Sequence, residues 1–422
     1  MERLGRALTD NWALFLGMLM LMVANGLLGT LLTIRGNELG FSILTISLMQ
    51  ASYPLGALAG TVAAPRLIEK VGHIRAFSAL ASLVSIAAIV HLLTSDPYSW
   101  SAMRLLSGIC VPGLYVITES WLHAKAENRM RAQILSIYFM IQLGGPALGT
   151  ALVGLPDPSG AMLFGAVSIL ISLSIVPLLL SDNKAPAYVA PERMRLRQLY
   201  RVSPMAVMGI FVVSIGFGAW FISLPLYALS RGFNEAQASG ALVVAMVASA
   251  LVQYPVGWLA DHVDRRKVVI GLAVIAAAAA IWLAIDRAPG RLVIGFAVIA
   301  AATLPIYSIL AAHANDHLTR AQIVPASGTM AFLLQFGQFF GALIGPNTIP
   351  LAGGRGLLIM LAAICLAVTV IAIARATRRQ APQETGETPV TGVLGIAQPG
   401  VFQAEVMAEE AEARRAPTDS ER

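Results

Sequence analysis

A charged side chain interrupts one of the long apolar runs of the sequence. Arg104 lies about two helical turns into the run 98–121, and Ser107, Tyr115 and Thr118 follow on the same helical face. An ionisable group at membrane depth is costly and is therefore a functional candidate. A guanidinium stays protonated at physiological pH, so it can bind an anion or organise polar neighbours, but it cannot carry a proton. The alternatives are an arginine that reaches the membrane surface and one that braces neighbouring helices.

Neutral polar and aromatic side chains also lie inside apolar runs, where they either line a cavity or pack between helices. Asn25 lies in the middle of the first run, and an amide in hydrocarbon needs hydrogen-bond partners. An aromatic stripe from Phe217 to Tyr227 follows helical spacing, for which packing is the commoner explanation. The candidates for a substrate cavity are Arg104, Asn25, Tyr115, Gln142, Trp220, Tyr307 and Gln338.

One carboxylate follows Arg104 on the same run. Glu119 comes 15 residues later, which is about 22 Å along a helix. That depth places it near one end of the run, within reach of basic residues such as Arg66, Lys70 and Arg75. We expect Glu119 to form a gate ion pair there. The alternative is a proton site that burial desolvates.

Histidine and cysteine offer weaker candidates. His91 and His317 lie at the ends of apolar runs, where a solvated histidine is ordinary, and His313 belongs near an inner loop. A proton relay is the alternative for these histidines. Cys110 and Cys365 lie far apart within apolar runs, so the sequence predicts neither a disulfide framework nor a metal site.

The composition indicates a membrane protein. Of 422 residues, 57% are apolar and 12% are charged, whereas a soluble domain has about 25% charged residues. No phosphate-binding glycine loop, nucleophile elbow or metal-spaced set of ligands occurs, so we expect neither an enzyme nor an ATP-driven pump, and no cofactor. The net charge of +6 comes from basic residues between the apolar runs, which argues against a nucleic-acid partner. The first run lacks a cleavage site, so we expect it to remain as a membrane helix.

Twelve apolar runs are long enough to cross a bilayer. They predict an all-α membrane protein with spans near 11–34, 43–64, 76–93, 98–121, 131–153, 161–180, 204–229, 237–260, 268–285, 290–313, 323–350 and 356–374. An even number of spans places both termini on one side. Twenty basic residues lie on that side and five on the other, so the positive-inside rule predicts cytoplasmic termini and a bacterial inner membrane.

The runs divide the chain into four parts. We expect a first half at 1–180, a cytoplasmic linker at 181–203 rich in proline and arginine, a second half at 204–375, and a tail at 376–422. The tail is rich in Pro, Gly, Thr and Glu and lacks an apolar period, which is typical of a disordered segment.

Two loops carry a matching pattern of charges. In the segment 257–267, Gly257 and Asp261 precede Arg265, Arg266 and Lys267. Asp261 follows the negative end of its own helix, so it needs a cation or the N-terminus of another helix as a partner. The earlier loop 65–75 aligns with this one and places Glu69 opposite Asp261 and Arg75 opposite Lys267, with Lys70 between them.

The helix interiors also repeat. Gln142, Gly145 and Gly149 in the fifth run match Gln338, Gly341 and Gly345 in the eleventh. Glycines at this spacing lie on one helical face and let neighbouring backbones approach closely. A proline follows Gly145 in the fifth run and Gly345 in the eleventh, and removes a backbone hydrogen bond there. The packing candidates are therefore Gly145, Pro146, Gly149, Gly341, Gly345 and Pro346.

The segment 257–267 resembles the signature loop of the major facilitator superfamily, with His262 and Asp264 where a base and a glycine are usual. The Arg-x-x-x-Gly start at Arg104 and the Glu-Ser pair at Glu119 resemble a poorly characterised bacterial branch of it. The resemblance covers residues 10–375 and implies two six-helix halves, with substrate bound between them near the midplane. It also implies that the arginine faces this cavity and serves proton coupling or anion binding.

The expected function is secondary transport of a small neutral or anionic solute by alternating access, without a metal, by a monomer in the lipid bilayer. The Gly145-Pro146 pair resembles a motif of antiporters, which favours export against proton entry. Proton-coupled uptake of a sugar, carboxylate or other metabolite is the first alternative. A receptor or scaffold that does not transport is the second, although the segment 380–422 contains no recognisable docking domain.

Overall fold

The computed structural model describes residues 2–125, 131–157, 160–180, 194–285 and 288–376; near several helix ends it describes the backbone alone. Fourteen α-helices and no β-strand occur in these ranges. The helices are α1 (Glu2–Glu38), α2 (Ile43–Val71), α3 (His73–Leu93), α4 (Pro97–Lys125), α5 (Arg131–Leu152), α6 (Ala161–Leu180), α7 (Leu196–Val202), α8 (Pro204–Ser230), α9 (Glu235–His262), α10 (Arg265–Ile285), α11 (Pro289–Asn315), α12 (Arg320–Thr348), α13 (Leu351–Gly354) and α14 (Gly356–Ala376).

The expected all-α membrane architecture is confirmed. Eleven helices of the described residues are long and apolar enough to cross a bilayer. The twelfth expected span, 131–153, is helix α5, several of whose side chains lie outside the described part of the chain. Within hydrocarbon a helix satisfies all of its own backbone hydrogen bonds, which explains why apolar runs of this length fold as helices.

Local sequence sets several helix starts. Asn234 and Gln237 form a reciprocal capping box at the start of α9, with N–O distances of 2.8 and 3.0 Å. Thr319 and Gln322 form the same box before α12. Each box satisfies backbone N–H groups that a helix start leaves unpaired.

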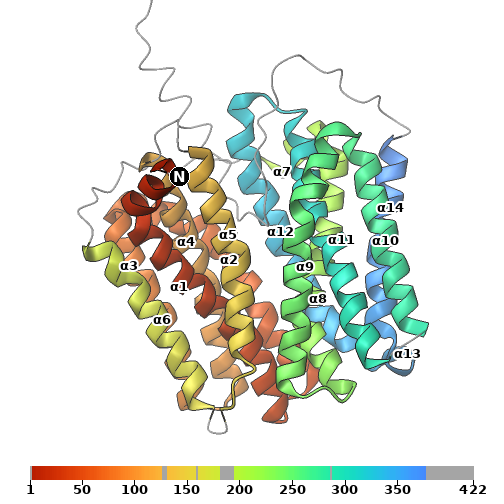
Figure 1. Ribbon diagram of the computed structural model, residues 1–422, viewed down its shortest axis with the longest axis horizontal. Coiled ribbons are helices and arrows are strands. Elements are labelled where there is room, and N and C mark those ends of the chain that lie inside the picture. The colour runs from red at the N-terminus through yellow and green to blue at the C-terminus, as the bar shows by residue number, and fades with distance from the viewer. Residues whose placement is uncertain (1, 126–130, 158–159, 181–193, 286–287, 377–422) are drawn as a thin grey trace, which may run out of the picture.

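The helices gather into two bundles that lie side by side (Figure 1). Helices α1 to α6 pack among themselves, as do α8 to α14, and the principal contacts between the sets are α2 with α12, α5 with α9, and α1 with α8. Near one end, the Asn347 amide donates a hydrogen bond of 3.0 Å to the Ser47 hydroxyl across this boundary.

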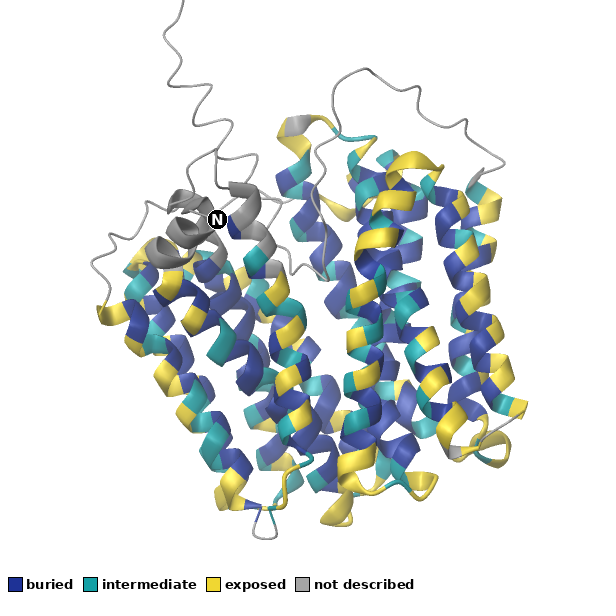
Figure 2. Cartoon of the chain, in the orientation of Figure 1, coloured by how far each residue is buried: buried dark blue, intermediate teal, exposed yellow. Residues whose placement is uncertain are grey.

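Many large apolar side chains are exposed. Figure 2 shows exposed residues in yellow along the outer helices. On α9, Leu251, Tyr254 and Trp258 are exposed by 72%, 71% and 57%. A soluble monomer rarely exposes apolar surface on this scale, whereas a lipid-facing helix requires it.

The structure adds one detail and corrects two. The segment 181–203, expected to be a cytoplasmic linker, contains the short helix α7, and residues 181–193 lie outside the described part of the chain. The expected run 323–350 ends at Thr348, after which α13 turns the chain. His91, expected to be solvated, is buried, because its ring stacks on Phe164 and packs edge-on against Trp100.

The turn at α13 has unusual backbone geometry. Ala352, Gly353 and Gly354 have φ values of 51°, 66° and 77°. Only glycine adopts this region without steric cost, so Ala352 is the strained member. The Tyr227 hydroxyl of α8 donates to the Gly354 carbonyl at 3.2 Å and fixes the turn.

Candidate functional site

A cavity of about 260 Å³ lies between the two bundles. Helices α1, α2, α4 and α5 of the first bundle and α8, α9 and α12 of the second contribute to its wall. Its lining residues are Asn25, Gly26, Gly29, Thr30, Gln50, Tyr53, Pro54, Arg104, Pro146, Thr150, Phe217, Gly218, Phe221, Ile222, Leu242, Met246, Leu334, Gln335, Gln338 and Ala342. Arg104 is the one charged residue among them.

Arg104 is held by neighbours from α2. Its Nε donates to the Gln50 side-chain oxygen at 3.0 Å, and its guanidinium carbon lies 4.4 Å from the centre of the Tyr53 ring. Gln50 in turn donates to the Thr33 hydroxyl at 2.6 Å and to the Gly29 carbonyl at 3.0 Å. This network fixes the plane of the guanidinium relative to the cavity.

The guanidinium is not saturated by these contacts. Arg104 is only 7% exposed, and its buried Nη1 atom has no hydrogen-bond partner among the described residues. Arg104 forms no ion pair with another described residue. An arginine that retains its charge and a spare donor in a cavity can bind an acceptor such as a carboxylate or a carbonyl oxygen.

A second polar group adjoins Arg104. The Asn25 amide donates to the Tyr115 hydroxyl at 3.2 Å, and Tyr53 interacts with both side chains. Asn25 therefore lines the cavity while Tyr115, which is 2% exposed, supports it from behind.

The second bundle supplies a mostly apolar wall. Helix α8 contributes Phe217 and Phe221 to the lining, α9 contributes Leu242 and Met246, and α12 adds the amide groups of Gln335 and Gln338. The buried Gln335 oxygen has no partner among the described residues. Gln50, Tyr53, Thr30 and Thr150 also line the cavity and were not among the candidates from the sequence. A hydroxyl in an apolar run usually bonds to its own helix, so it gives little signal in the sequence.

The structure brings three of the seven cavity candidates to the lining, namely Arg104, Asn25 and Gln338. Gln142 donates instead to the Tyr138 hydroxyl at 2.5 Å. Trp220 and Tyr307 are buried elsewhere, and the Trp220 ring packs edge-on against Phe221 with centroids 4.8 Å apart. These residues support the cavity wall or the bundle core.

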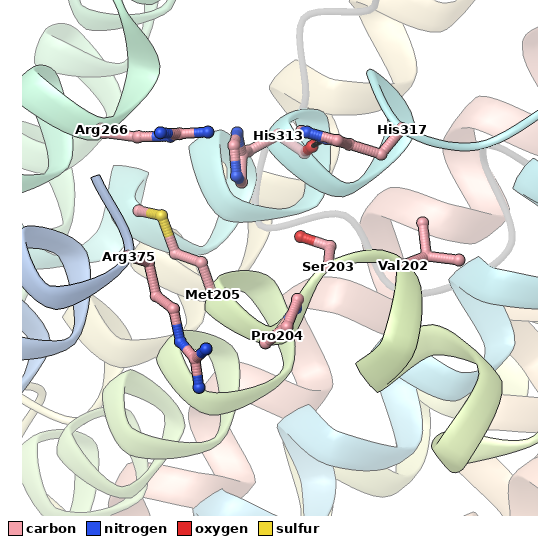
Figure 3. Close-up of a pocket in the computed structure, with 8 residues that line it drawn as sticks. All are labelled: Val202, Ser203, Pro204, Met205, Arg266, His313, His317 and Arg375. Atoms are coloured by element: carbon pink, nitrogen blue, oxygen red, sulfur yellow. Dashed lines mark hydrogen bonds between the residues drawn. The ribbon is translucent and has the colours of Figure 1, made fainter. Parts of the chain in front are cut away.

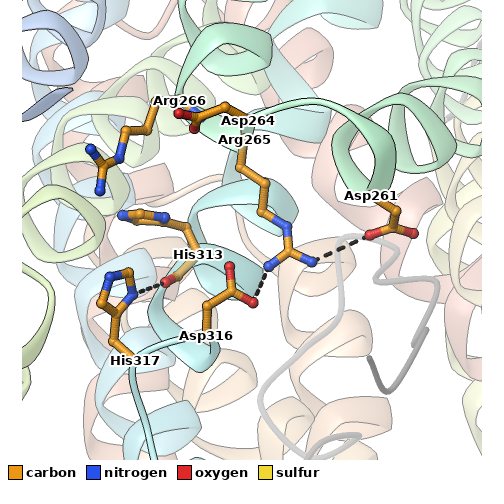
Figure 4. Close-up of polar contacts among 7 residues, drawn as sticks. All are labelled: Asp261, Asp264, Arg265, Arg266, His313, Asp316 and His317. Carbon is orange, nitrogen blue, oxygen red and sulfur yellow. Dashed lines mark hydrogen bonds and ion pairs between the residues drawn. The ribbon is translucent and has the colours of Figure 1, made fainter. Parts of the chain in front are cut away.

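The loop between α9 and α10 forms an ion-pair network (Figure 4). The Arg265 guanidinium donates to Asp261 at 3.3 Å and also pairs with Asp316 of α11. Asp261, which needed a partner at the end of its helix, thus meets a cation. Arg266 is 4% exposed and points the other way, whereas Gly257 borders open space.

The corresponding loop of the first half differs. Glu69, Lys70 and Arg75 are all exposed, and no ion pair joins them to another described residue. The side chain of Glu119, expected to form a gate ion pair, lies outside the described part.

Glycines bring helix backbones together at equivalent places in both halves. A Cβ at Gly149 of α5 would collide with the Val23 carbonyl of α1. A Cβ at Gly341 of α12 would collide with the Ile215 carbonyl of α8. Gly145 faces Met22 and Gly345 faces Ala219 in the same two contacts, while Gly26 lies on the Pro146 backbone. Pro346 interrupts α12 shortly before it ends.

No group of three or more potential metal ligands occurs among the described residues. The cavity chemistry is therefore that of a guanidinium, amides, hydroxyls and aromatic faces, which suits reversible binding of a small organic molecule.

Known proteins are similar to this chain in sequence. A "Uncharacterized MFS-type transporter" of Yersinia pseudotuberculosis serotype O:3 is 25% identical over 382 residues, covering 87% of this chain and 96% of that protein. The uncharacterized MFS-type transporter YcaD of Escherichia coli O7:K1 is 27% identical, covering 78% of this chain and 85% of its own.

Two solved structures share the fold. The nucleoside transporter NupG superposes with a TM-score of 0.67 at 13% identity, covering 88% of this chain and 99% of NupG. A variant of the Escherichia coli fucose:proton symporter FucP gives 0.54 at 15% identity, covering 88% and 99%. The profile described as "Major Facilitator Superfamily" matches residues 14–250 and 230–405. The chain is a membrane transporter that belongs to the Major Facilitator Superfamily.

Proposed function

We propose that this transporter moves a small neutral or anionic organic solute by alternating access, with Arg104 as the anchor for its polar or anionic group. The observation that carries the proposal is the unpartnered Nη1 of a buried arginine in the cavity wall. A bound carboxylate would supply the acceptor that this atom lacks and would compensate the charge.

The remainder of the cavity supports an apolar or stacked body on the solute. Phe217 and Phe221 offer aromatic faces, and Gln335 and Gln338 offer amides on the same side. A permanently cationic solute fits poorly, because the lining residues include a cation and no carboxylate.

Export against proton entry is the proposed direction, supported by the Gly145-Pro146 pair, with proton-coupled uptake of a sugar, carboxylate or other metabolite as the alternative. A candidate proton carrier lies outside the cavity. Glu38 at the end of α1 pairs with Arg35 at 2.6 Å, and Glu235 at the start of α9 lies beside Glu38. Two neighbouring carboxylates repel each other when both are ionised, which favours a proton on one of them. This contact joins the two halves.

The transport proposal is tested with the purified full chain in proteoliposomes. A panel of neutral, anionic and quaternary ammonium solutes is screened for flux under an imposed proton gradient of either polarity. We expect that protons moving down their gradient in one direction drive a neutral or anionic solute across the membrane in the opposite direction. Efficient transport of the quaternary ammonium compounds would overturn the proposed substrate class, and flux indifferent to the gradient would overturn proton coupling.

Glu38→Gln and Glu235→Gln test the proton carrier in the same assay. We expect both variants to lose gradient-driven flux while retaining exchange of solute across the membrane. Glu69→Gln is the matched control, because Glu69 is an exposed carboxylate without an ion pair to another described residue. Equal loss in all three variants would refute a specific role for the carboxyl pair.

The orientation we propose has both termini in the cytoplasm of a bacterium, with the chain in the inner membrane. Single cysteines at Ser95 and Asp157 should react with an impermeant reagent from outside, whereas one at Pro191 should be protected in intact cells. External labelling at Pro191 would reverse the assignment. We also propose that residues 1–180 and 204–375 act as the two moving units, with 181–203 as their connection.

A further inference from the structure

A second cavity, of about 190 Å³, lies within the second bundle and apart from the substrate cavity (Figure 3). Its wall comes from the start of α8, the start of α10 and the ends of α11 and α14. The positive-inside assignment places this end of the bundle at the cytoplasm. The two cavities have no lining residue in common.

The lining of this second cavity is basic. Arg266, Arg375, His313 and His317 all contribute to it, and the lining residues include no Asp or Glu. Arg265 is engaged with Asp261 and Asp316, whereas the neighbouring Arg266 extends toward His313 (Figure 4). Asp264 lies beside this group, and its carboxylate accepts the backbone N–H of Arg266 at 2.9 Å. Arg375 is held at the rim by the Tyr200 hydroxyl at 3.4 Å.

The start of α8 adds donors of a different kind. Ser203 is the N-cap of this 27-residue helix, yet its side chain makes no capping hydrogen bond. The residue is 2% exposed, and its buried hydroxyl has no partner among the described residues. In Figure 3 this hydroxyl extends into the space below the two histidines. A helix N-terminus carries a partial positive charge and free N–H groups, so it favours an anion at this place.

Two histidines lie against each other in the wall of this cavity. His317 Nδ1 lies 2.8 Å from the His313 carbonyl oxygen, and the two rings pack edge-on with centroids 4.8 Å apart. The Nδ1–H of His317 is used by this carbonyl, so the other nitrogen of a neutral His317 is an acceptor. His313 is therefore the imidazole that can donate a hydrogen bond to an anion without a charge of its own.

We propose that this cavity binds a phosphoryl group, carried either by the headgroup of an anionic phospholipid or by a soluble phosphate. A tetrahedral oxyanion has several oxygen atoms that accept hydrogen bonds. The guanidinium, the hydroxyl and the helix N-terminus can donate to different oxygens of one such anion, whereas each donor alone would bind it weakly. The bound anion would join α8, α10, α11 and α14 at one end, and would thereby hold the second half together.

The test uses the full chain, purified in detergent and depleted of lipid. Its thermal unfolding midpoint is measured with sodium phosphate against sodium chloride at equal ionic strength. A second pair of samples compares mixed micelles of phosphatidylglycerol with micelles of phosphatidylcholine. We expect a rise of several degrees in at least one comparison, because a ligand that binds only the folded state stabilises it.

Two variants locate the effect. Arg266→Gln removes the buried cation, and Ser203→Ala removes one oxygen atom and leaves the helix start otherwise unchanged. Each should weaken anion binding by about tenfold, as expected for the loss of one charge-assisted hydrogen bond. Arg201→Gln is the matched control, because Arg201 is exposed on α7 and does not line the cavity.

The outcomes separate the two sources. Stabilisation by inorganic phosphate that Ser203→Ala reduces assigns the site to a soluble phosphate. Stabilisation by phosphatidylglycerol alone, reduced in the same variant, assigns it to a lipid headgroup. Absence of both shifts in the wild type, or equal shifts in Arg266→Gln, Ser203→Ala and Arg201→Gln, would overturn the proposal. Because Ser203→Ala is a conservative change, misfolding of Arg266→Gln would leave the test intact.

Discussion

The two halves of this transporter pack their helices alike but give the cavity between them different chemistry. In the first half Gly149 lies against the backbone of α1, and in the second Gly341 lies against the backbone of α8. The first half supplies the cavity with Arg104 and its hydrogen-bonded neighbours. The second supplies aromatic rings and amides without a charge. The close helix contact recurs in both halves because two backbones can approach this closely only where the side chain is very small. The charge has no counterpart in the second half, because one cation in the cavity wall is enough to bind an anionic group.

The largest expected effect concerns the charge that only the first half carries. We expect Arg104→Ala to lower transport by about 100-fold, which corresponds to roughly 2.7 kcal/mol and is the size of a lost hydrogen bond to a charged group. Arg104→Lys should not restore activity, because an ammonium lacks the planar fork that meets Gln50 and the solute together. Initial rates of solute flux in proteoliposomes measure this.

Arg231→Ala provides the control for Arg104, because Arg231 is exposed at the end of α8 and lies outside the cavity lining. Wild-type rates in Arg104→Ala would show that the charge asymmetry between the halves has no role in transport.

The shared packing plan predicts matched losses of stability. Gly149→Ala and Gly341→Ala each place a methyl group against a neighbouring helix backbone, and we expect each to destabilise the protein by about 1–3 kcal/mol. Gly144→Ala is the control, since a Cβ at Gly144 meets no other atom within 4 Å. Thermal unfolding midpoints in detergent report the difference. A fall in only one half would mean that the halves do not share this constraint.

A smaller effect is expected from the amides on the two sides of the cavity. Gln50→Ala removes the acceptor for Arg104 Nε, so we expect solute affinity to fall about tenfold. Gln338→Ala removes no hydrogen bond to a charged group of the described residues, so it should lower solute affinity only a few-fold. Isothermal titration with a transported solute distinguishes them. An equal effect of the two substitutions would contradict the assignment of the anchor to the first half.

The smallest effect is expected at the signature loops, which differ in their partners. Asp261→Asn breaks a partly exposed ion pair with Arg265, and such pairs contribute about 0–1 kcal/mol. We expect faster hydrogen exchange of the loop between α9 and α10 and a lowered turnover. Glu69→Gln, which removes no ion pair between described residues, should change neither quantity. The reverse order of effects would show that the first loop controls the gate.

The sequence predicts the helices well, because a run of about 20 apolar residues has no other stable fold in a bilayer. The sequence is a poorer guide to which side of a helix faces the cavity. The aromatic stripe on α8 illustrates the reason. Phe217 and Phe221 line the cavity, whereas Trp220, between them in sequence, is buried beside Phe221. Helical spacing places all three residues near one face of α8. The rotation of α8 about its own axis, which its packing against α9 and α12 sets, decides which of them line the cavity.

Two further failures have the same origin. His91 was expected to be solvated because it ends a span, yet the aromatic rings of Trp100 and Phe164, from two other helices, enclose it. The second cavity, proposed to bind a phosphoryl group, could not be predicted from the sequence. Its lining residues Ser203, Arg266, His313 and Arg375 come from four segments that are distant in the chain. Arg104 could be predicted from the sequence, because a single charged residue in an apolar run can be recognised without knowledge of the tertiary structure.

The turn at α13 has a consequence for how the second half moves. It connects the end of α12 to the start of α14 through three consecutive residues of positive φ, which reverse the chain with no slack. A tether this short prevents the two helices from separating at that end. Any tilt of α12, whose amides line the substrate cavity, therefore carries α14 with it. The displacement of a cavity-lining helix is in this way passed to α14, which carries Arg375 in its last turn at the far side of the membrane.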